Sequence, residues 1–489
     1  MAPDYDNSSE ARTTGSKPWI KPTIVPLRSG SLNKFGKAHD SSWTDAIDNV
    51  PVKDLLDQYD SPLFVFSEQR LRRNSQRLKQ AFCARYPDVL LAWSYKTNYL
   101  GALCNVFHQE GAWAEVVSDF EYEKARGLGV PGERIFFNGP GKKPEALRRA
   151  VAEGARIHID HLDELYALEK ITKDLERSLD VTLRLNFDTG YTEPWSRFGF
   201  NVESGQAMDA AWRIASSEHM SLTGLHSHIG TFVLEPKAYA VQARIMCNFL
   251  DEVESRTDCN IDYLDLGGGF ASMNSLQGIY LPADQVVPSV EQYAEAICDV
   301  LLELTHDREA RGMKRPTLVL ETGRALVDDA GYLLTKVIAN KRLPDGRRAV
   351  IVDAGVGQLF TAFWYNHNVV STRLLSGRPE ETVIYGPLCM NIDVMRASIM
   401  LPPLNVGDTL LFTPVGAYNT TQWMQFIEYR PNVLLIHGDK SVSVIRRKEN
   451  LATVTASELI PEHLVRACPQ GDRIGGGDTI SVSDAACEK

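Results

Sequence analysis

Short apolar runs alternate with longer amphipathic segments between about residues 89 and 323. The runs are typical of buried parallel strands, and the longer segments have helical periodicity. Eight strands that are each followed by a helix predict a (β/α)8 barrel, although a doubly wound sheet would show a similar alternation. The predicted strands are Val89–Asn98, Ala112–Val117, Arg134–Gly139, Arg156–Asp160, Val181–Asn186, Leu222–Gly230, Tyr263–Gly269 and Thr317–Gly323, and the clearest predicted helices are Pro144–Glu153, Leu162–Leu175, Tyr239–Glu254 and Val290–Thr305.

Polar residues or glycines stand at the C-terminal end of nearly every run. Lys96, Asn138, His228 and Glu321–Arg324 are examples. In a closed barrel the carboxyl ends of the strands converge on one face, and the active sites of barrel enzymes lie there. We therefore expect a functional site at this face.

The pattern changes after about residue 325, where strand-like pieces such as Tyr332–Ile338 and Val433–Ile436 are separated by turn signals. This predicts a mostly β domain, which the strand-like piece Pro62–Phe66 joins or borders. We expect four regions: a polar N-terminal segment (1–60) that packs partly on the β domain, a barrel (61–324), the β domain (325–467) and a flexible tail (468–489).

Composition narrows the class of protein. The chain has 489 residues, of which 44% are hydrophobic and 24% charged, as in ordinary globular proteins. Its net charge of −11 argues against a nucleic-acid surface, and no apolar run approaches the ~20 residues of a membrane helix. The eight cysteines are scattered without a CxxC pair, and the N-terminus has no apolar signal core. We therefore expect free thiols and a cytoplasmic protein, without nucleic-acid or membrane partners.

Three motifs at the expected barrel mouth carry candidate chemistry. Lys96, in YKTN, ends a buried strand, so it either reaches solvent or holds pyridoxal phosphate as a Schiff-base lysine. Gly267–Gly269 could close backbone amides around a phosphate, or serve only as a hinge. Arg324 offers a phosphate contact, and Glu321 either keeps a heterocyclic nitrogen protonated or forms an ordinary salt bridge.

The histidines of LHSHIGT and two residues of the β domain leave several interpretations open. His226 and His228 share one side of a strand, a spacing found in buried pairs and in metal sites. His228 could instead lie flat over a planar cofactor while Thr231 contacts its phosphate; we assign no metal site. Cys389 follows a GPL turn that could present a thiol, although taken alone it is more typical of a small buried residue. Tyr418, taken alone, is equally unremarkable.

Taken together and in this order, the motifs resemble those of the fold-type III pyridoxal-phosphate decarboxylases, closely those of diaminopimelate decarboxylase and more distantly those of ornithine decarboxylase. The resemblance covers about residues 60 to 440. It is carried by SYKTN, VVSDFEYEKARGLGV, RIFFNGPGK, IDHLDEL, RLN, RFGF, GLHSHIGT, LDLGGGF, ETGR, VDAGVGQL, GPLCMNID and GAYN.

The resemblance implies a role for each matching residue. Lys96 would form the imine with the cofactor, His228 would stack on its ring, and Glu321 would pair with the pyridinium nitrogen. Glu115 and Glu121 match acidic positions near the lysine and the ring. The phosphate would be bound by Thr231, Gly267, Gly268, Gly269, Gly323, Arg324 and Tyr418.

The resemblance also implies a homodimer with shared active sites. Cys389 would come from the partner protomer and, as a thiol, return a proton to Cα after CO₂ has left. The expected substrate pocket comprises Thr361, Trp364, Tyr365, Cys389, Met390 and Asp393.

Two departures from the family pattern concern the substrate. Met390 stands where diaminopimelate decarboxylases usually have Glu and ornithine decarboxylases have Asp, and Leu359–Trp364 lacks the Arg-Pro that diaminopimelate enzymes tend to have. A diamino substrate would thus lose its anionic partner, which predicts an amino acid other than meso-diaminopimelate. Five apolar residues could either form the edge of the substrate pocket or simply pack in the core: Phe363, Trp364, Met390, Trp423 and Met424.

Two alternative functions use the same fold. An amino-acid racemase or epimerase would usually place Arg at the pyridine nitrogen, so Glu321 favours decarboxylation. A non-catalytic binding protein related to the decarboxylases could lose its cofactor ligands, whereas Lys96, Gly267–Gly269 and Arg324 are all present.

Overall fold

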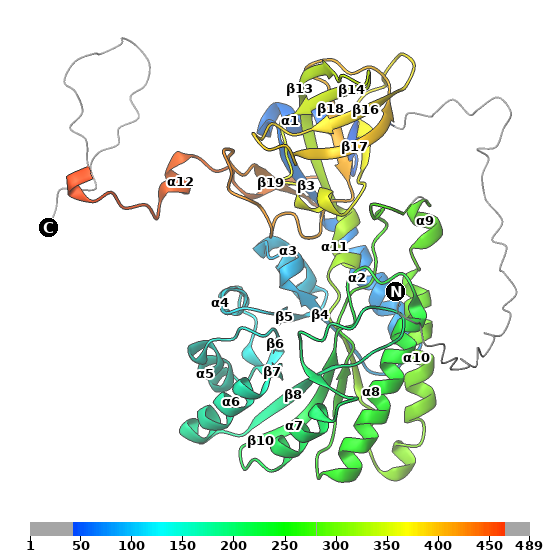
Figure 1. The fold of residues 1–489 in the computed structure, drawn as a ribbon, viewed down its shortest axis with the longest axis vertical. Helices are drawn as coiled ribbons and strands as arrows, with labels where there is room; N and C mark the ends of the chain where they lie inside the picture. The colour runs from blue at the N-terminus through cyan, green and yellow to red at the C-terminus, as the bar shows by residue number, and fades with distance from the viewer. Residues whose placement is uncertain (1–42, 280, 465–489) are drawn as a thin grey trace, which may run out of the picture.

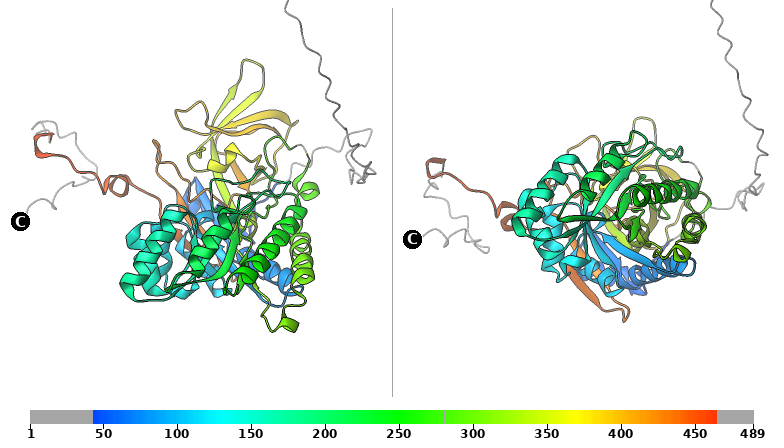
Figure 2. Two further views of the ribbon diagram at one scale, coloured as in Figure 1. Left: turned by 60° about the horizontal axis from the view of Figure 1, so that its bottom comes forward. Right: turned by 90° about the horizontal axis from the view of Figure 1, so that it is seen from below.

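Eight parallel strands form a closed barrel in the computed structural model, which describes residues 43–279 and 281–464. Strand β8 pairs with β10, and β12 pairs with β4, so the ring has no free edge and the doubly wound alternative is wrong. Helices surround this ring in the view from below (Figure 2). The strands are β4 (Val89–Ser94), β5 (Trp113–Val116), β6 (Ile135–Phe137), β7 (Arg156–Ile159), β8 (Leu179–Asn186), β10 (Met220–Ser227), β11 (Tyr263–Asp265) and β12 (Thr317–Leu320).

The outer helices begin and end where the sequence places capping residues. α5 (Pro144–Glu153) starts with a proline and stops at Gly154, which has a φ of 75°, and α10 (Val290–Thr305) starts with a capping box of Ser289 and Gln292. Three predicted helices match exact bounds, whereas α8 (Pro236–Arg256) is longer than predicted. The other helices are α2 (Glu68–Cys83), α3 (Gly101–Gln109), α4 (Asp119–Gly127), α6 (Leu162–Leu175) and α7 (Gln206–Ala215), with the short α9 (Ala283–Val286), α11 (Arg324–Val327) and α12 (Leu451–Thr455). The two-residue strand β9 (Phe200–Asn201) pairs with β8 beside the ring.

A second, mostly antiparallel sheet confirms the expected β domain. Its order is β17-β16-β14-β13-β3-β19-β20, and β18 pairs with both β13 and β15. The early strand β3 lies between β13 and β19, as the piece Pro62–Phe66 suggested. The strands are β3 (Leu63–Ser67), β13 (Gly331–Arg342), β14 (Arg348–Val352), β15 (Asn368–Ser371), β16 (Glu380–Tyr385), β17 (Val394–Leu401), β18 (Thr409–Thr413), β19 (Asn432–Ile436) and β20 (Val442–Arg446).

The described part of the N-terminal segment packs on this second sheet. It contains β1 (Ala46–Ile47), β2 (Val50–Pro51) and α1 (Val52–Tyr59), whose Val52 and Leu55 are buried with Val65 and Leu334. Residues 1–42 and the predicted tail 468–489 lie outside the described residues. The four-region division stays a prediction. Strand β3 lies within the range predicted for the barrel (61–324), but it pairs in the second sheet. None of the described helices is long and apolar enough to cross a membrane.

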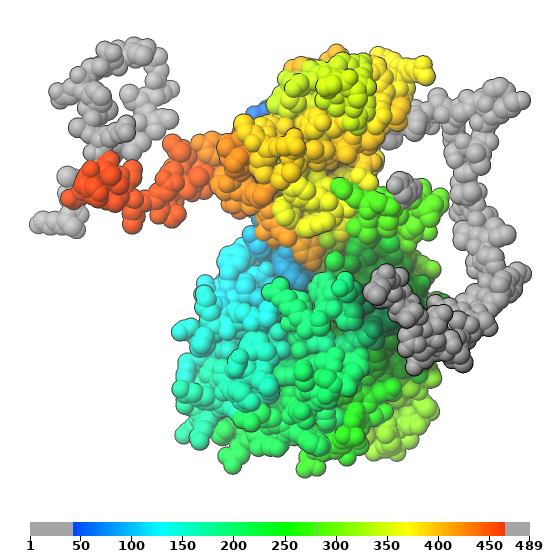
Figure 3. Space-filling view, viewed as in Figure 1, coloured from blue at the N-terminus to red at the C-terminus, as the bar shows by residue number. Residues whose placement is uncertain are grey.

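The second sheet sits on the carboxyl ends of the barrel strands (Figures 1 and 3). A loop before β19 is fixed there by hydrogen bonds from Asn98 Nδ2 to Gly416 O (3.1 Å) and from Tyr418 N to Thr97 O (2.9 Å). The contact is so close that a Cβ on Gly416 would lie 1.9 Å from the carbonyl oxygen of Val327. This junction places side chains of the β domain at the barrel mouth.

A buried ion pair ties the ends of two barrel strands together. The Lys142 ammonium lies 2.6 Å from Glu164 Oε1 and donates hydrogen bonds to the carbonyl oxygens of Gly139 and His158. Both charged side chains are almost fully buried, at 1% and 3% exposure. Burial lowers the pKa of Lys142. The pair thus fixes the loop after β6, which leads from Asn138 into the barrel mouth.

We expect Lys142→Met to lower the free energy of unfolding by about 3–5 kcal/mol, because it leaves Glu164 charged and buried without a partner. Chemical denaturation monitored by circular dichroism measures this change. The matched control is Lys143→Met, next in sequence but 74% exposed, which should change stability by less than about 1 kcal/mol. Equal effects of the two substitutions would contradict the structural role of Lys142.

Candidate active site

A cavity of about 650 Å³ opens at the barrel mouth, under the loop that carries Tyr418. Its walls come from the carboxyl ends of barrel strands and from two segments of the β domain. The cavity brings together ten of the predicted site residues: Lys96, His228, Thr231, Gly269, Glu321, Gly323, Arg324, Trp364, Tyr365 and Tyr418.

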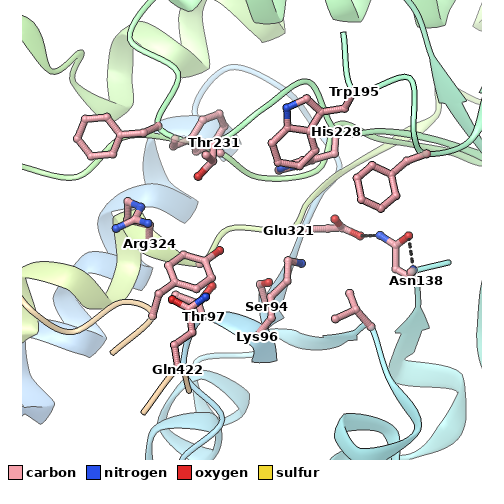
Figure 4. A pocket seen from close by; sticks show the side chains of 18 of the residues that line it. Ser94, Lys96, Thr97, Asn138, Trp195, His228, Thr231, Glu321, Arg324 and Gln422 are labelled. Atoms are coloured by element: carbon pink, nitrogen blue, oxygen red, sulfur yellow. Dashed lines mark hydrogen bonds between the residues drawn. The ribbon is translucent and has the colours of Figure 1, made fainter. Parts of the chain in front are cut away.

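Lys96 lies in a short 3-10 turn (Tyr95–Thr97) directly after β4, and its side chain points into the cavity (Figure 4). Its Nζ donates a 2.7 Å hydrogen bond to Oε2 of Glu115, which is fully buried on β5. Burial alone would lower the pKa of Lys96, but Glu115 and Glu321 outweigh it and raise the pKa. For Glu115, burial raises the pKa despite the neighbouring ammonium. The lysine side chain is therefore a cation that Glu115 holds in place within the cavity.

Glu321 follows β12 and is almost completely buried at the other side of the cavity floor. Its Oε1 accepts a hydrogen bond from Asn138 Nδ2 (3.1 Å), and its Oε2 lies 3.3 Å from His226 Nε2. No lysine or arginine pairs with Glu321 among the described residues, so the ordinary salt bridge allowed by the sequence is absent there. A carboxylate held by neutral donors remains able to bind a cationic group from the cavity.

Arg324 begins α11 and presents unpaired donors. Its guanidinium lies 4.8 Å from the ring centroids of both Tyr365 and Tyr418, and its nearest carboxylate oxygen, on Asp328, is 3.8 Å away. Nε and Nη1 are buried without a hydrogen-bond partner. Buried donors are nearly always satisfied in folded proteins, so these two indicate an anion in the cavity.

The glycine run after β11 turns tightly beside these groups. Gly267 and Gly269 have φ values of 68° and 91°, and a Cβ on Gly268 would lie 2.3 Å from the carbonyl oxygen of Glu321. The amide of Gly268 donates to Nδ1 of His228 (3.2 Å), which fixes that ring at the cavity. Burial, with Lys96 and Arg184, lowers the pKa of His228 well below its usual value. The imidazole is therefore neutral and available for stacking.

The two ends of the cavity differ in chemistry. Arg324 and Thr231 lie at one end and Glu321 with Asn138 at the other, while Lys96 and His228 lie between them (Figure 4). A phosphate suits the first end, a protonated ring nitrogen the second, and an aldehyde the lysine. The residues present therefore fit pyridoxal 5'-phosphate, and the orphaned donors of Arg324 are the observation that supports the fit.

Several predicted site residues do not line this cavity. The Oε2 atom of Glu121, at the start of α4, accepts a hydrogen bond from the amide of Val117, and burial raises the pKa of Glu121 to about 7. Thr361 is buried and bonded to His367 and Asn419. Gly267 and Gly268 shape the turn but lie behind the cavity surface.

Cys389 and Met390 lie on a loop after β16, away from the cavity. Asp393 fixes this loop because its carboxylate accepts hydrogen bonds from the amides of Val356 (2.8 Å) and Leu388 (2.7 Å). Cys389 is exposed, so the buried-residue interpretation of this thiol is wrong. Of the five residues considered as an apolar pocket edge, only Trp364 lines the cavity of this protomer.

Sequence reasoning left out several residues that line the cavity. Asn138 had a signal, since it ends a predicted strand, but its bond to Glu321 depends on pairing across the barrel. Arg184 is buried in β8, where it lies 3.3 Å from Asp160. Trp195 and Arg197 come from the loop between β8 and β9, and Gln422 from the β domain. Strand β8, the loop that follows it and the segment with Gln422 lie far apart in sequence, and their hydrophobic pattern does not show that they meet at one cavity.

Comparisons with known proteins agree with this geometry. The family model described as "Pyridoxal-dependent decarboxylase, pyridoxal binding domain" matches residues 68–328, more than half of the chain. The diaminopimelate decarboxylase of Methanocaldococcus jannaschii is 29% identical over 438 residues, which cover 86% of this chain and 96% of that protein. That of Bacillus subtilis is 29% identical over 417 residues, with 82% and 92% covered.

Solved structures show the same architecture. A crystal structure of the M. jannaschii enzyme in complex with L-lysine has a TM-score of 0.78 and 27% identity, and covers 88% of this chain and 98% of that one. A lysine/ornithine decarboxylase from Vibrio vulnificus, at 21% identity and a TM-score of 0.66, covers 80% and 98% and supports the fold alone. The chain therefore belongs to the pyridoxal-dependent decarboxylases and is an amino-acid decarboxylase that uses pyridoxal phosphate.

Proposed function

We propose that this cavity removes the α-carboxylate of an amino acid, with Lys96 as the residue that carries the cofactor. One observation carries the proposal: the Lys96 ammonium and the Glu321 carboxylate face the same cavity, whose other end holds the unpaired donors of Arg324. Bound pyridoxal phosphate supplies an aldehyde that captures amines and a ring that accepts the electron pair left at Cα.

The chain's own residues have distinct tasks in this proposal. Arg324 and Thr231 bind the phosphate, while the neutral His228 supports the ring from one face. Glu321 holds a proton on the ring nitrogen, which keeps the ring electron-poor when negative charge develops at Cα. Glu115 orients Lys96 Nζ through their 2.7 Å hydrogen bond. Together these contacts favour loss of CO₂ over reactions that need a less electron-poor ring.

We expect sodium borohydride to fix the cofactor's mass on the Lys96 peptide of the holoenzyme, as mapped by mass spectrometry. Lys142 and Lys143, which lie outside the cavity, are the internal controls and should stay unmodified. Lys96→Ala should lower kcat by more than about a thousandfold because the group that carries the cofactor is lost. An active enzyme without a mass increase at Lys96 would refute the assignment.

We further propose a homodimer in which each protomer supplies Cys389 to its partner's site. The thiol is exposed on a loop whose shape Asp393 fixes, yet it does not line the cavity of its own protomer. Association of two chains could place this exposed thiol in the cavity of the second chain. There Cys389 would return a proton to Cα after CO₂ has left.

Mixed dimers test this arrangement. Lys96→Ala and Cys389→Ala protomers should each be nearly inactive alone, whereas random mixing should restore about a quarter of the wild-type activity, since half of the dimers then contain one intact site. The assay is CO₂ release after subunit exchange. Mixing the Lys96→Ala protein with Cys83→Ala, an exposed cysteine on α2, should give half of the wild-type activity with or without exchange, and so controls for loss of activity on mixing. No recovery in the first mixture would contradict shared sites.

The substrate class is proposed from the charges at the cavity. Glu321 is the only carboxylate that lines it among the described residues, whereas Arg184 and Arg197 add positive charge, and Met390 adds no anion to the Cys389 loop. A second substrate amine would therefore lack a partner, which favours an amino acid other than meso-diaminopimelate. The relatives are named diaminopimelate decarboxylases, which does not support excluding diaminopimelate as the substrate. The substrate assay below decides the point.

We expect CO₂ release from diaminopimelate, ornithine, lysine and arginine to be slower than from acidic or apolar amino acids. Met390→Glu should shift the ratio toward diamino substrates by about tenfold or more, because it supplies a counter-charge. Met400→Glu, an exposed methionine on β17, is the matched control and should leave the ratio unchanged. Efficient wild-type turnover of diaminopimelate would overturn the substrate proposal but not the decarboxylase assignment.

We also propose a cytoplasmic location. Six cysteines in the described residues are free, and free thiols are typical of reducing compartments.

A further inference from the structure

Four buried titratable side chains form a layer inside the barrel, below the cavity. They are His158 on β7, His226 on β10, Asp265 on β11 and Glu321 after β12. One ligand-type atom from each lies within 4.8 Å of those from the other three. Only Glu321 has a role in the proposed function, so the other three side chains need a physical explanation.

His158 lies between the two carboxyl groups of this layer without a hydrogen bond to either. Its Nε2 lies 4.0 Å from Asp265 Oδ2, and its Nδ1 lies 3.8 Å from Glu321 Oε1. These separations are about 1 Å longer than a hydrogen bond, within reach of a small ring movement. Both nitrogens and Asp265 Oδ2 lack any other partner among the described residues. The opposite atom, Asp265 Oδ1, accepts from the amide of Gly267 (2.8 Å), so Oδ2 is the free one.

The layer cannot hold two ionised carboxylates at low cost, because like charges this close repel strongly in a dry interior. Burial, reinforced by Glu321, raises the pKa of Asp265 well above its usual value. Burial also lowers the pKa of His158 and of His226 well below theirs. Asp265 and both imidazoles are therefore neutral.

The nearby charges do not alter this conclusion. Lys142 is paired with Glu164, and Arg184 lies 3.3 Å from Asp160. The remaining two, Lys96 and Glu115, are paired with each other. The charged neighbours are thus compensated in pairs.

We propose that Asp265 is a neutral carboxylic acid that donates to His158 Nε2, and that His158 Nδ1–H in turn donates to Glu321. His158 and Asp265 are then positioning residues for the contact between Glu321 and the cofactor's ring nitrogen, which rests on the proposed function of Glu321. His226 Nε2–H and Asn138 Nδ2 complete the set of donors around the carboxylate. These three neutral donors stabilise the Glu321 carboxylate as the acceptor for the protonated ring nitrogen.

The same four side chains have the composition of a site for a divalent metal ion. A metal there would use the carboxylate of Glu321 as a ligand and would compete with the cationic ring for it. A neutral Asp265 requires no metal, since the proton on its carboxyl group already removes the repulsion between Asp265 and Glu321. Metal analysis of the purified holoenzyme separates the two cases.

The decisive comparison is between two substitutions at Asp265. Asp265→Asn keeps the shape and can still donate to His158, so it should retain kcat within about threefold and leave the visible spectrum of the bound cofactor unchanged. Asp265→Leu and His158→Phe break the chain of hydrogen bonds, so kcat should fall by about 10- to 100-fold. Their spectra should shift in the same direction as that of Glu321→Gln, a signature that general destabilisation would not produce.

Infrared spectroscopy tests the proton directly, without reliance on activity. The holoenzyme should show the C=O stretch of a buried neutral carboxylic acid, which Asp265→Asn removes and Glu321→Gln retains. Absence of that band, a stoichiometric bound metal, or an Asp265→Asn spectrum like that of Glu321→Gln would overturn the inference. If Glu321→Gln itself keeps the wild-type spectrum and kcat, the proposed role of Glu321 fails, while the infrared band still decides the protonation of Asp265.

Discussion

Compensation of buried charge is the constraint on which the barrel mouth depends. A barrel interior is dry, and an isolated ion there costs several kcal/mol, so each ionised group must find a partner nearby. Lys96 is held by Glu115, Lys142 by Glu164, and Arg184 lies close to Asp160. Glu321 and Arg324 are the exceptions, because Glu321 has no lysine or arginine partner in the described chain, and Arg324 has only Asp328, 3.8 Å from its Nη1. These two groups leave charge that a bound molecule can neutralise, and they mark the site.

The second sheet depends on the same junction. Its loop reaches the barrel only because Gly416 lacks a side chain where Val327 passes, and because Asn98 and Thr97 bond to the loop's backbone. Tyr418 is thereby set against Arg324, so that its ring lies 4.8 Å from the guanidinium, which also has the Asp328 carboxylate at 3.8 Å. An aromatic ring stabilises the cation without occupying its hydrogen-bond donors, which stay available to an anion.

Much of the fold was accessible from sequence because it follows local rules. The bounds of α5, α6 and α10 match those predicted, since periodicity and capping residues act within a few positions. Strand ends were less accurate: the run Tyr263–Gly269 ends as a strand at Asp265, because the glycines that follow turn with positive φ. Strands β15, β17 and β20 were not predicted; β17 and β20 lie at the two ends of the strand order, where exposed residues interrupt the apolar pattern.

The site divides into a part that sequence reveals and a part that only three-dimensional pairing creates. Lys96, Glu321 and Arg324 each end a strand and could be recognised one at a time, whereas the contacts of Asn138 and His158 with Glu321 join strands far apart in the chain. The two parts also differ in position: the groups suited to the cofactor lie at strand ends, while Met390 lies on a loop that does not line the cavity. A substitution at position 390 touches none of the buried ion pairs at the barrel mouth. Relatives at 29% identity can therefore share the chemistry with this chain and still differ in the amino acid that they accept.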